Sequence, residues 1–284
     1  MSTAPRPFTF KSTDGLTLSG EKAGVRGGPP VILLHGGGQT RHSWSGAVRE
    51  LATRGYEVIN LDARGHGDSQ WAVQAHHYSL SFLADDLLRI IDTLSELPVL
   101  VGASMGGLTA LQIIGSHSKP VASALVLVDI VPRIEKDGAE RILRFMNGHP
   151  EGFATIEEAA AAVAAYNPAR ARPQNATGLM KNLRATPAGR LRWHWDPKFL
   201  EELRADDLES SQALLHRCRH FSAPTLLVRG MQSDMVSESG IAELKASLPQ
   251  LEVFDVEEAG HMIAGDKNDV FNAGVLDFLE RHQS

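Results

Sequence analysis

VGASMGG, residues 101–107, places Ser104 between small residues directly after an apolar run. The residues from 104 to 114, SMGGLTALQII, are predicted to form a helix that begins at this serine. Gly102 and Gly106 lack side chains, so the chain can bend sharply from strand to helix and hold Ser104 at the tip of a strained turn. A serine that only caps the helix, beside glycines needed for packing, is the alternative that the motif alone leaves open.

The sequence on both sides of this turn alternates between short apolar runs and segments with helical periodicity. Continuous apolar runs of strand length, such as residues 31–34, are typical of strands buried on both faces of a parallel sheet. The alternation predicts an α/β fold with a mostly parallel sheet. The predicted strands are residues 31–34, 56–61, 99–101, 124–128, 225–228 and 251–256, with an edge hairpin at 8–10 and 16–21, and the predicted helices are 44–54, 83–94, 104–114, 241–248 and 270–281.

Residues 131–221 break this alternation. The segment is rich in Ala, Arg and Glu, is punctuated by Pro and Gly, and contains no convincing strand pattern. We therefore expect a helical lid at 131–221, inserted into a core made of residues 1–130 and 222–284. A chain of 284 residues is long enough for one such domain with an insertion.

Composition excludes several classes of protein. A net charge of −6 provides no broad positive field for nucleic acid or anionic lipid, so we expect neither partner. The single cysteine, Cys218, excludes an internal disulfide and a cysteine-based metal site. The sequence has no apolar leader and no run of about 18 apolar residues, which favours a cytoplasmic protein without a membrane span. No H-E-x-x-H motif is present, His76 and His77 are expected to be a solvated pair, and neither a metal nor an organic cofactor is expected.

Two further loops supply the other groups that an acyl-transfer enzyme needs. His261 in AGHMIAGD and Asp234 in RGMQSD each follow a predicted strand, where side chains reach the usual ligand crevice of a parallel sheet. We predict that Ser104 is the nucleophile, His261 its base, and Asp234 the carboxylate that fixes the histidine tautomer. Asp129, which ends the strand ALVLVD, is the alternative acid unless it is a structural residue at the start of the lid.

The donors for a developing oxyanion are predicted from backbone amides. The first is the amide of Met105, directly after the nucleophile, and the second comes from the HGGG stretch, with Gly37 preferred over Gly38. Glycine lets the backbone approach a substrate closely. His35 in the same stretch is expected to form structural hydrogen bonds instead of acting as a base.

With these residues in view, the chain resembles the α/β-hydrolase superfamily over nearly its full length, on the motifs HGGGQTRHSW, LDARGHGDS, GASMGG, RGMQSD and AGHMI. Within it, the chain is similar to lidded bacterial esterases and chloroperoxidase-like perhydrolases. The resemblance implies a Ser-Asp-His triad on an eight-stranded, mostly parallel sheet flanked by helices. Dehalogenases and many epoxide hydrolases of this superfamily carry Asp where this chain has Ser104, whereas carbon-carbon bond hydrolases share the serine. In RGHGDS the arginine and histidine are expected to brace the turn beneath the oxyanion loop.

These features predict a serine hydrolase, in solution a monomer or small homo-oligomer, that cleaves a small carboxylic ester, lactone or thioester through an acyl-enzyme. A carbon-carbon bond hydrolase, a perhydrolase and a non-catalytic small-molecule binding protein on the same fold remain alternatives. The lid aromatics either line the acyl pocket or dock the lid onto the core, and Arg190 and Arg192 are expected to be solvated. The predicted pocket residues are Trp44, Phe145, Met146, Trp193, Trp195 and Met262, with Tyr166 and Phe199 nearby in the lid.

Overall fold

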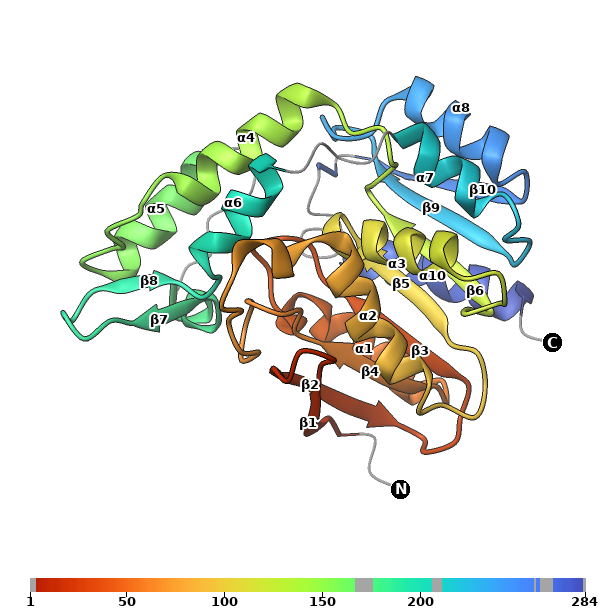
Figure 1. Cartoon of the computed structure of the whole chain (residues 1–284), viewed down its shortest axis with the longest axis horizontal. Helices are drawn as coiled ribbons and strands as arrows, with labels where there is room; N and C mark the ends of the chain where they lie inside the picture. Colours follow the sequence, from red (N-terminus) through yellow and green to blue (C-terminus); the bar gives the residue numbers. More distant parts are fainter. Residues whose placement is uncertain (1–3, 167–175, 206–210, 258, 261–267, 283–284) are drawn as a thin grey trace.

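A computed structural model describes residues 4–166, 176–205, 211–257, 259–260 and 268–282. It contains the predicted eight-stranded, mostly parallel sheet, in the order β1-β2-β4-β3-β5-β6-β9-β10 (Figure 1). β2 runs antiparallel to its neighbours β1 and β4, and the remaining pairs are parallel. The strands are β1(Arg6–Lys11), β2(Thr17–Gly24), β3(Pro30–Leu34), β4(Glu57–Leu61), β5(Val99–Ala103), β6(Ala124–Val128), β9(Thr225–Gly230) and β10(Leu251–Val256).

Helices cover both faces of the sheet because its central strands are apolar on both sides. In β3, Ile32 and Leu34 face one layer, whereas Val31 and Leu33 face the other. The first layer holds α2(Leu80–Ile91), α3(Met105–Ser116), α7(Ser211–Cys218) and α8(Glu238–Ser247), and the second holds α1(Ser45–Thr53) and α10(Asn268–His282) (Figure 1). Among the described residues, no helix combines the length and the apolar character that crossing a bilayer requires.

Part of the chain between β6 and β9 forms a layer of its own beside the sheet, with α4, α5, α6 and a small hairpin on one side of the molecule (Figure 1). Its elements are α4(Lys136–Asn147), α5(Ile156–Tyr166), the 3-10 helix at Ala176–Asn182, β7(Leu183–Ala185), β8(Leu191–Trp193) and α6(Pro197–Ala205). The expectation that this segment contains no strand is wrong, because β7 and β8 pair in antiparallel fashion. Each has only three residues, too few to show an alternating pattern in the sequence.

The last helix of this segment packs with the core. α7 lies within residues 131–221, yet its Leu214, Leu215 and Cys218 are buried in the same cluster as α3 and α8. The elements from α4 to α6, residues 136–205, form the part of this segment called the insertion. The boundaries of the lid as a separate unit stay a prediction.

Candidate active site

Ser104 occupies a strand-to-helix turn between β5 and α3. Its φ and ψ are 46° and −115°, and its N–H donates to the Val128 carbonyl at 3.2 Å. The turn is possible because two neighbours are glycine: a Cβ on Gly102 would lie 2.5 Å from the Gly106 carbonyl oxygen, and one on Gly106 would lie 2.3 Å from the Leu34 oxygen. The sharp bend that the VGASMGG pattern predicts is therefore present, and close packing explains both glycines.

The geometry of Ser104 differs from that of a helix-capping serine. Capping residues normally have backbone angles in the β region and accept a hydrogen bond from the helix amides. Ser104 has a positive φ, and within the described residues its hydroxyl makes no capping hydrogen bond to α3. Met105 starts the helix, where the first amides have no acceptor inside the helix. The hydroxyl and the Met105 amide thus lie together at the N-terminus of α3.

The loop that follows β3, residues 35–39, lies against this turn, because β3 and β5 are neighbours in the sheet. It is called the oxyanion loop after the role that the sequence predicts for it. A Cβ built on Gly36 would lie 3.4 Å from the Ser104 Cβ. The Gly38 amide donates to His66 Nε2 at 3.0 Å, so this amide is already engaged. The sequence predicts that Gly37 or Gly38 supplies the second oxyanion donor. Because the Gly38 amide is engaged, Gly37 is the better candidate to act together with the Met105 amide.

Asp129 lies one residue beyond β6, the strand next to the one that leads to Ser104. It is fully buried and has a φ of 49°. Its Oδ1 accepts from the Gly230 amide at 3.0 Å, and its Oδ2 accepts a hydrogen bond from the Ser233 hydroxyl. One donor at the end of β9 and one just after it thus hold this carboxylate, in the residue that follows the Val128 carbonyl bonded to Ser104.

Asp234 lies in a different environment. Its side chain is 37% exposed, and its Oδ1 forms an ion pair with Arg141 Nη2 of α4 at 3.0 Å. A Cβ on Gly138 would lie 2.5 Å from the Asp234 carbonyl oxygen, which places this residue against the insertion. The described contacts of Asp234 are therefore made with α4 and not with the serine turn.

His261 and Met262 lie outside the described residues. The two residues before them are described, and they run beside the end of β9. A Cβ on Gly230 would lie 2.5 Å from the Ala259 oxygen and 2.6 Å from the Gly260 oxygen. Because the Gly230 amide binds Asp129, Ala259 and Gly260 lie close to the backbone that holds that carboxylate.

Residues of the insertion cover the oxyanion loop. An added Cβ on Gly37 would lie 3.2 Å from the Phe199 ring, and one on Gly38 would lie 2.9 Å from Met146 Cε and 3.4 Å from the Trp195 ring. Met105 belongs to the same apolar cluster. In this cluster Trp193 stacks on Trp195, with ring centroids 5.0 Å apart, and Phe145 stacks on Tyr166 at 4.5 Å.

The other predicted pocket residue, Trp44, lies elsewhere. Its ring packs against Phe271 at 5.6 Å, in the core layer of α1 and α10. Arg190 donates to the carbonyls of Glu151 and Gly152, both at 2.8 Å. Arg192 lies 4.4 Å from the centre of the Trp71 ring. Arg190 therefore forms structural hydrogen bonds, whereas Arg192 is exposed, as predicted, with its guanidinium over the Trp71 ring.

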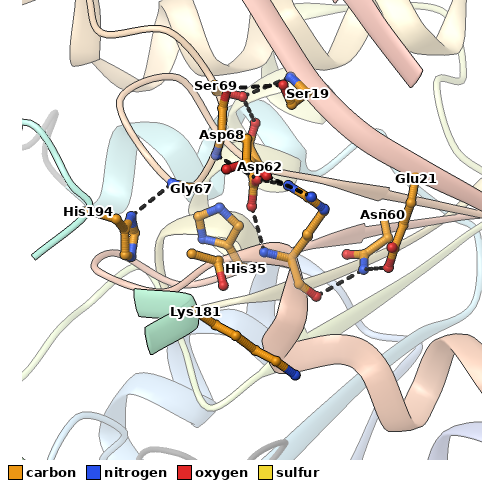
Figure 2. Close-up of polar contacts among 12 residues, drawn as sticks. Ser19, Glu21, His35, Asn60, Asp62, Gly67, Asp68, Ser69, Lys181 and His194 are labelled. Atoms are coloured by element: carbon orange, nitrogen blue, oxygen red, sulfur yellow. Dashed lines mark hydrogen bonds and ion pairs between the residues drawn. The ribbon is translucent and has the colours of Figure 1, made fainter. Parts of the chain in front are cut away.

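Sequence reasoning missed the role of Asp62, the first acidic residue of the LDARGHGDS stretch. Its side chain is buried; Oδ1 accepts from the Arg41 amide at 2.7 Å, and Oδ2 binds the Arg41 guanidinium and accepts from the Asp68 amide at 3.0 Å (Figure 2). The carboxylate ties the turn at 62–69 to the chain that follows the oxyanion loop. The LDARGHGDS motif contains Asp62, but the sequence alone does not reveal its role. Its main partner, Arg41, is distant from it in the chain.

Three buried histidines, His35, His66 and His194, gather beneath the oxyanion loop. Their ring centroids are 5.3 Å apart for His35 and His66 and 5.7 Å apart for His66 and His194. Burial lowers the pKa of all three, that of His66 well below its usual value and that of His194 to about 3. Both ring nitrogens of each are hydrogen-bonded to the backbone, and the described residues contain no cluster of three or more side chains suited to a metal ion.

Comparison with known proteins finds hydrolases and esterases among the similar chains. A 3-hydroxybutyrate-oligomer hydrolase from Cupriavidus necator is 29% identical over 245 residues, covering 81% of this chain and 82% of that protein. An esterase from Mycobacterium tuberculosis is 29% identical over 250 residues, covering 84% of this chain and 78% of that protein. Among solved structures, an alpha/beta hydrolase from Novosphingobium aromaticivorans matches with a TM-score of 0.82 at 25% identity, covering 99% of each chain.

The match to a protein family is equally extensive. Residues 29–267 match the family described as alpha/beta hydrolase fold. This range begins at the first parallel strand, β3, includes the serine turn and the whole insertion, and ends just before α10. The chain belongs to the alpha/beta hydrolase fold family.

Proposed function

We propose that this protein is a serine esterase that hydrolyses a small carboxylic ester through an acyl-enzyme. The observation that carries the proposal is the strained backbone of Ser104, which holds a hydroxyl at the start of α3, next to the Met105 amide. An esterase and a 3-hydroxybutyrate-oligomer hydrolase among the similar proteins support the same chemistry.

In the proposed reaction, His261 takes the Ser104 hydroxyl proton while the oxygen attacks the ester carbonyl carbon. The amides of Met105 and Gly37 stabilise the negative oxygen of the tetrahedral intermediate. The carbon–oxygen bond to the alcohol then breaks, and the alcohol leaves with the proton from His261. Water next attacks the acyl-enzyme and gives a proton to the same histidine. The bond between the acyl carbon and the serine oxygen then breaks, the histidine returns the proton to that oxygen, and the acid and the free serine are released.

We further propose that Asp129, not Asp234, is the carboxylate that orients His261. Asp129 is buried beside the serine turn and is bonded to Gly230, which the chain leading to position 261 contacts. Asp234 is partly exposed and pairs with Arg141. A buried carboxylate next to an imidazole fixes its tautomer better than an exposed one that an arginine already neutralises.

The direct test replaces Ser104 by Ala and measures turnover of a short-chain aryl ester together with labelling by a fluorophosphonate probe. We expect the wild-type protein to turn over many times and to be labelled, and Ser104→Ala to lose the label and at least about 10³-fold in kcat. Undiminished turnover by the Ala variant refutes the proposal. A single slow turnover with retained product would instead favour a binding protein.

A further inference from the structure

The oxyanion loop is held by one histidine at each of three consecutive peptide groups. The Gly36 carbonyl, in the group that carries the Gly37 amide, accepts from His35 Nδ1 at 2.8 Å. The Gly38 amide, in the next group, donates to His66 Nε2 at 3.0 Å. The Gly38 carbonyl, in the third group, accepts from His194 Nε2 at 3.2 Å. A peptide group is planar, so these bonds fix the direction of each amide along the loop.

Each ring uses its other nitrogen to bind the turn at residues 63–67. Every histidine therefore cross-links two backbone segments, accepting through one nitrogen and donating through the other, which requires the neutral ring in one tautomer. The second partners are the Ala63 amide for His35 Nε2 at 3.0 Å, the Arg64 carbonyl for His66 Nδ1 at 3.1 Å, and the Gly67 amide for His194 Nδ1 at 2.8 Å.

His194 differs from the other two because the insertion supplies it. It lies between β8 and α6, its side chain is almost fully buried, and its own amide donates to the Asn182 carbonyl at 3.1 Å. Figure 2 shows its ring bonded to Gly67, across from His35. The insertion thus reaches the peptide group that carries the Gly38 carbonyl, two groups beyond the one that carries the predicted oxyanion donor, the Gly37 amide.

We infer that His194 is a positioning residue through which the insertion sets the geometry of the oxyanion hole. The inference rests on the proposed function. Gly38 has a φ of 74°, and Met146 of α4 lies where its Cβ would stand, so the preferences of a glycine backbone do not by themselves fix the direction of its carbonyl. The peptide group that carries this carbonyl is held at its amide end, where Gln39 N–H donates to the Gly36 carbonyl at 3.1 Å, and at its carbonyl end by His194. Oxyanion donors act through preorganisation, and a small rotation of the Gly37 amide weakens them in the transition state but not in the ground state.

Two substitutions at residue 194 separate its two hydrogen bonds. His194→Asn keeps an acceptor near the position of Nδ1, for the Gly67 amide, but removes the donor to the Gly38 carbonyl. His194→Gln carries an amide nitrogen near the position of Nε2 and keeps that donor. We expect Asn to lower kcat for an aryl ester about tenfold, less than the ~10²–10³ lost with a donor itself. The KM should stay within about twofold, and the affinity for an aryl boronic acid, a tetrahedral analogue, should fall by the same factor as kcat. The kcat of His194→Gln and its affinity for the boronic acid should both stay within about threefold of the wild-type values.

Arg184→Gln is the matched control. Arg184, on β7, donates to the Gly67 carbonyl and to Asp68 Oδ1, both at 2.9 Å, so it anchors the insertion to the same turn without touching the oxyanion loop. It should leave kcat and the boronic acid affinity unchanged. An equal loss of kcat in Arg184→Gln and in His194→Asn overturns the inference. An unchanged kcat in a folded His194→Asn protein also overturns it. If Asn does not fold, a loss beyond tenfold in the Gln variant overturns it.

A failure of the proposed function can be told apart from a failure of this inference. If the wild-type protein shows no turnover that depends on Ser104, the esterase proposal fails. Amide hydrogen exchange of residues 36–39 then still tests His194. We expect exchange there to be about tenfold faster in His194→Asn than in His194→Gln, and equal rates overturn the positioning role.

Discussion

Ser104 and Asp129 are the two residues other than glycine, in the described part of the chain, that have a positive φ. They lie one residue beyond the ends of the neighbouring parallel strands β5 and β6. Strained backbones of this kind cost free energy and cluster at functional sites. The shared strain places a hydroxyl and a buried carboxylate at the same edge of the sheet.

This relationship predicts different outcomes for the two candidate acids. Asp129→Asn should lower kcat by on the order of 10³–10⁴, because an amide can hold the histidine in the wrong tautomer. The kcat of Asp234→Asn should stay within about threefold of the wild-type value, because the Asp234 carboxylate is partly exposed and paired with Arg141. Steady-state kinetics on one aryl ester compare the variants, and circular dichroism checks that both fold. The reverse ranking would return the role to Asp234.

The serine turn should tolerate no side chain at Gly106. A Cβ there would lie 2.3 Å from the Leu34 backbone oxygen, so the sheet and α3 would have to separate. We expect Gly106→Ala to reduce the free energy of unfolding by about 3 kcal/mol or more, the upper end of usual overpacking. Urea unfolding measures it. Gly178→Ala is the control, since a Cβ there meets nothing within 4 Å and the midpoint should barely move.

Acid should destabilise the protein partly through His194. Its pKa is lowered from 6.5 to about 3 by burial, so the folded state favours the neutral ring. Well above pH 6.5 the ring is neutral in both the folded and the unfolded state, so His194 does not reduce the free energy of unfolding. As the pH falls below 6.5 only the unfolded state takes up the proton, so stability declines until the pH reaches about 3, where both states bind it.

The size of this effect can be isolated by comparing two proteins. Between pH 8 and pH 5 the wild type should lose about 2 kcal/mol more stability than His194→Gln, which has no group titrating there. Urea midpoints at both pH values measure the difference, and other titrating groups cancel in the comparison. Equal losses would mean that His194 is not held neutral.

The buried ion pair between Arg64 and Asp86 should matter for stability. Arg64 is fully buried and donates to both oxygens of Asp86 at 2.7 Å, and burial raises the pKa of that carboxyl. Arg64→Gln should cost about 3–5 kcal/mol, because it leaves a buried carboxylate without its cation. Urea unfolding tests this. Arg133→Gln, which breaks an exposed pair with Glu243, should leave the midpoint unchanged.

Much of the fold could be predicted from local patterns. The strand at 124–128 matches β6 to the residue, and the other predicted core strands and helices lie within a few residues of the observed ones. Apolar runs and helical periodicity report burial directly, which is why these predictions succeed. The β7–β8 hairpin is not predicted from the sequence, because strands of three residues are too short to show an alternating pattern. The prediction that Trp44 lines the pocket is wrong, because its ring packs with Phe271 in the core.

The sequence by itself determined the eight-stranded framework and the serine turn, because both depend on residues that are neighbours in the chain. Only the tertiary structure decided which aspartate lies beside Ser104 and which histidines hold the oxyanion loop. These depend on the order of strands in the sheet, since β6 lies between β5 and β9, and on where the insertion returns to the core. Contacts between distant segments are set by packing, and no local pattern encodes them.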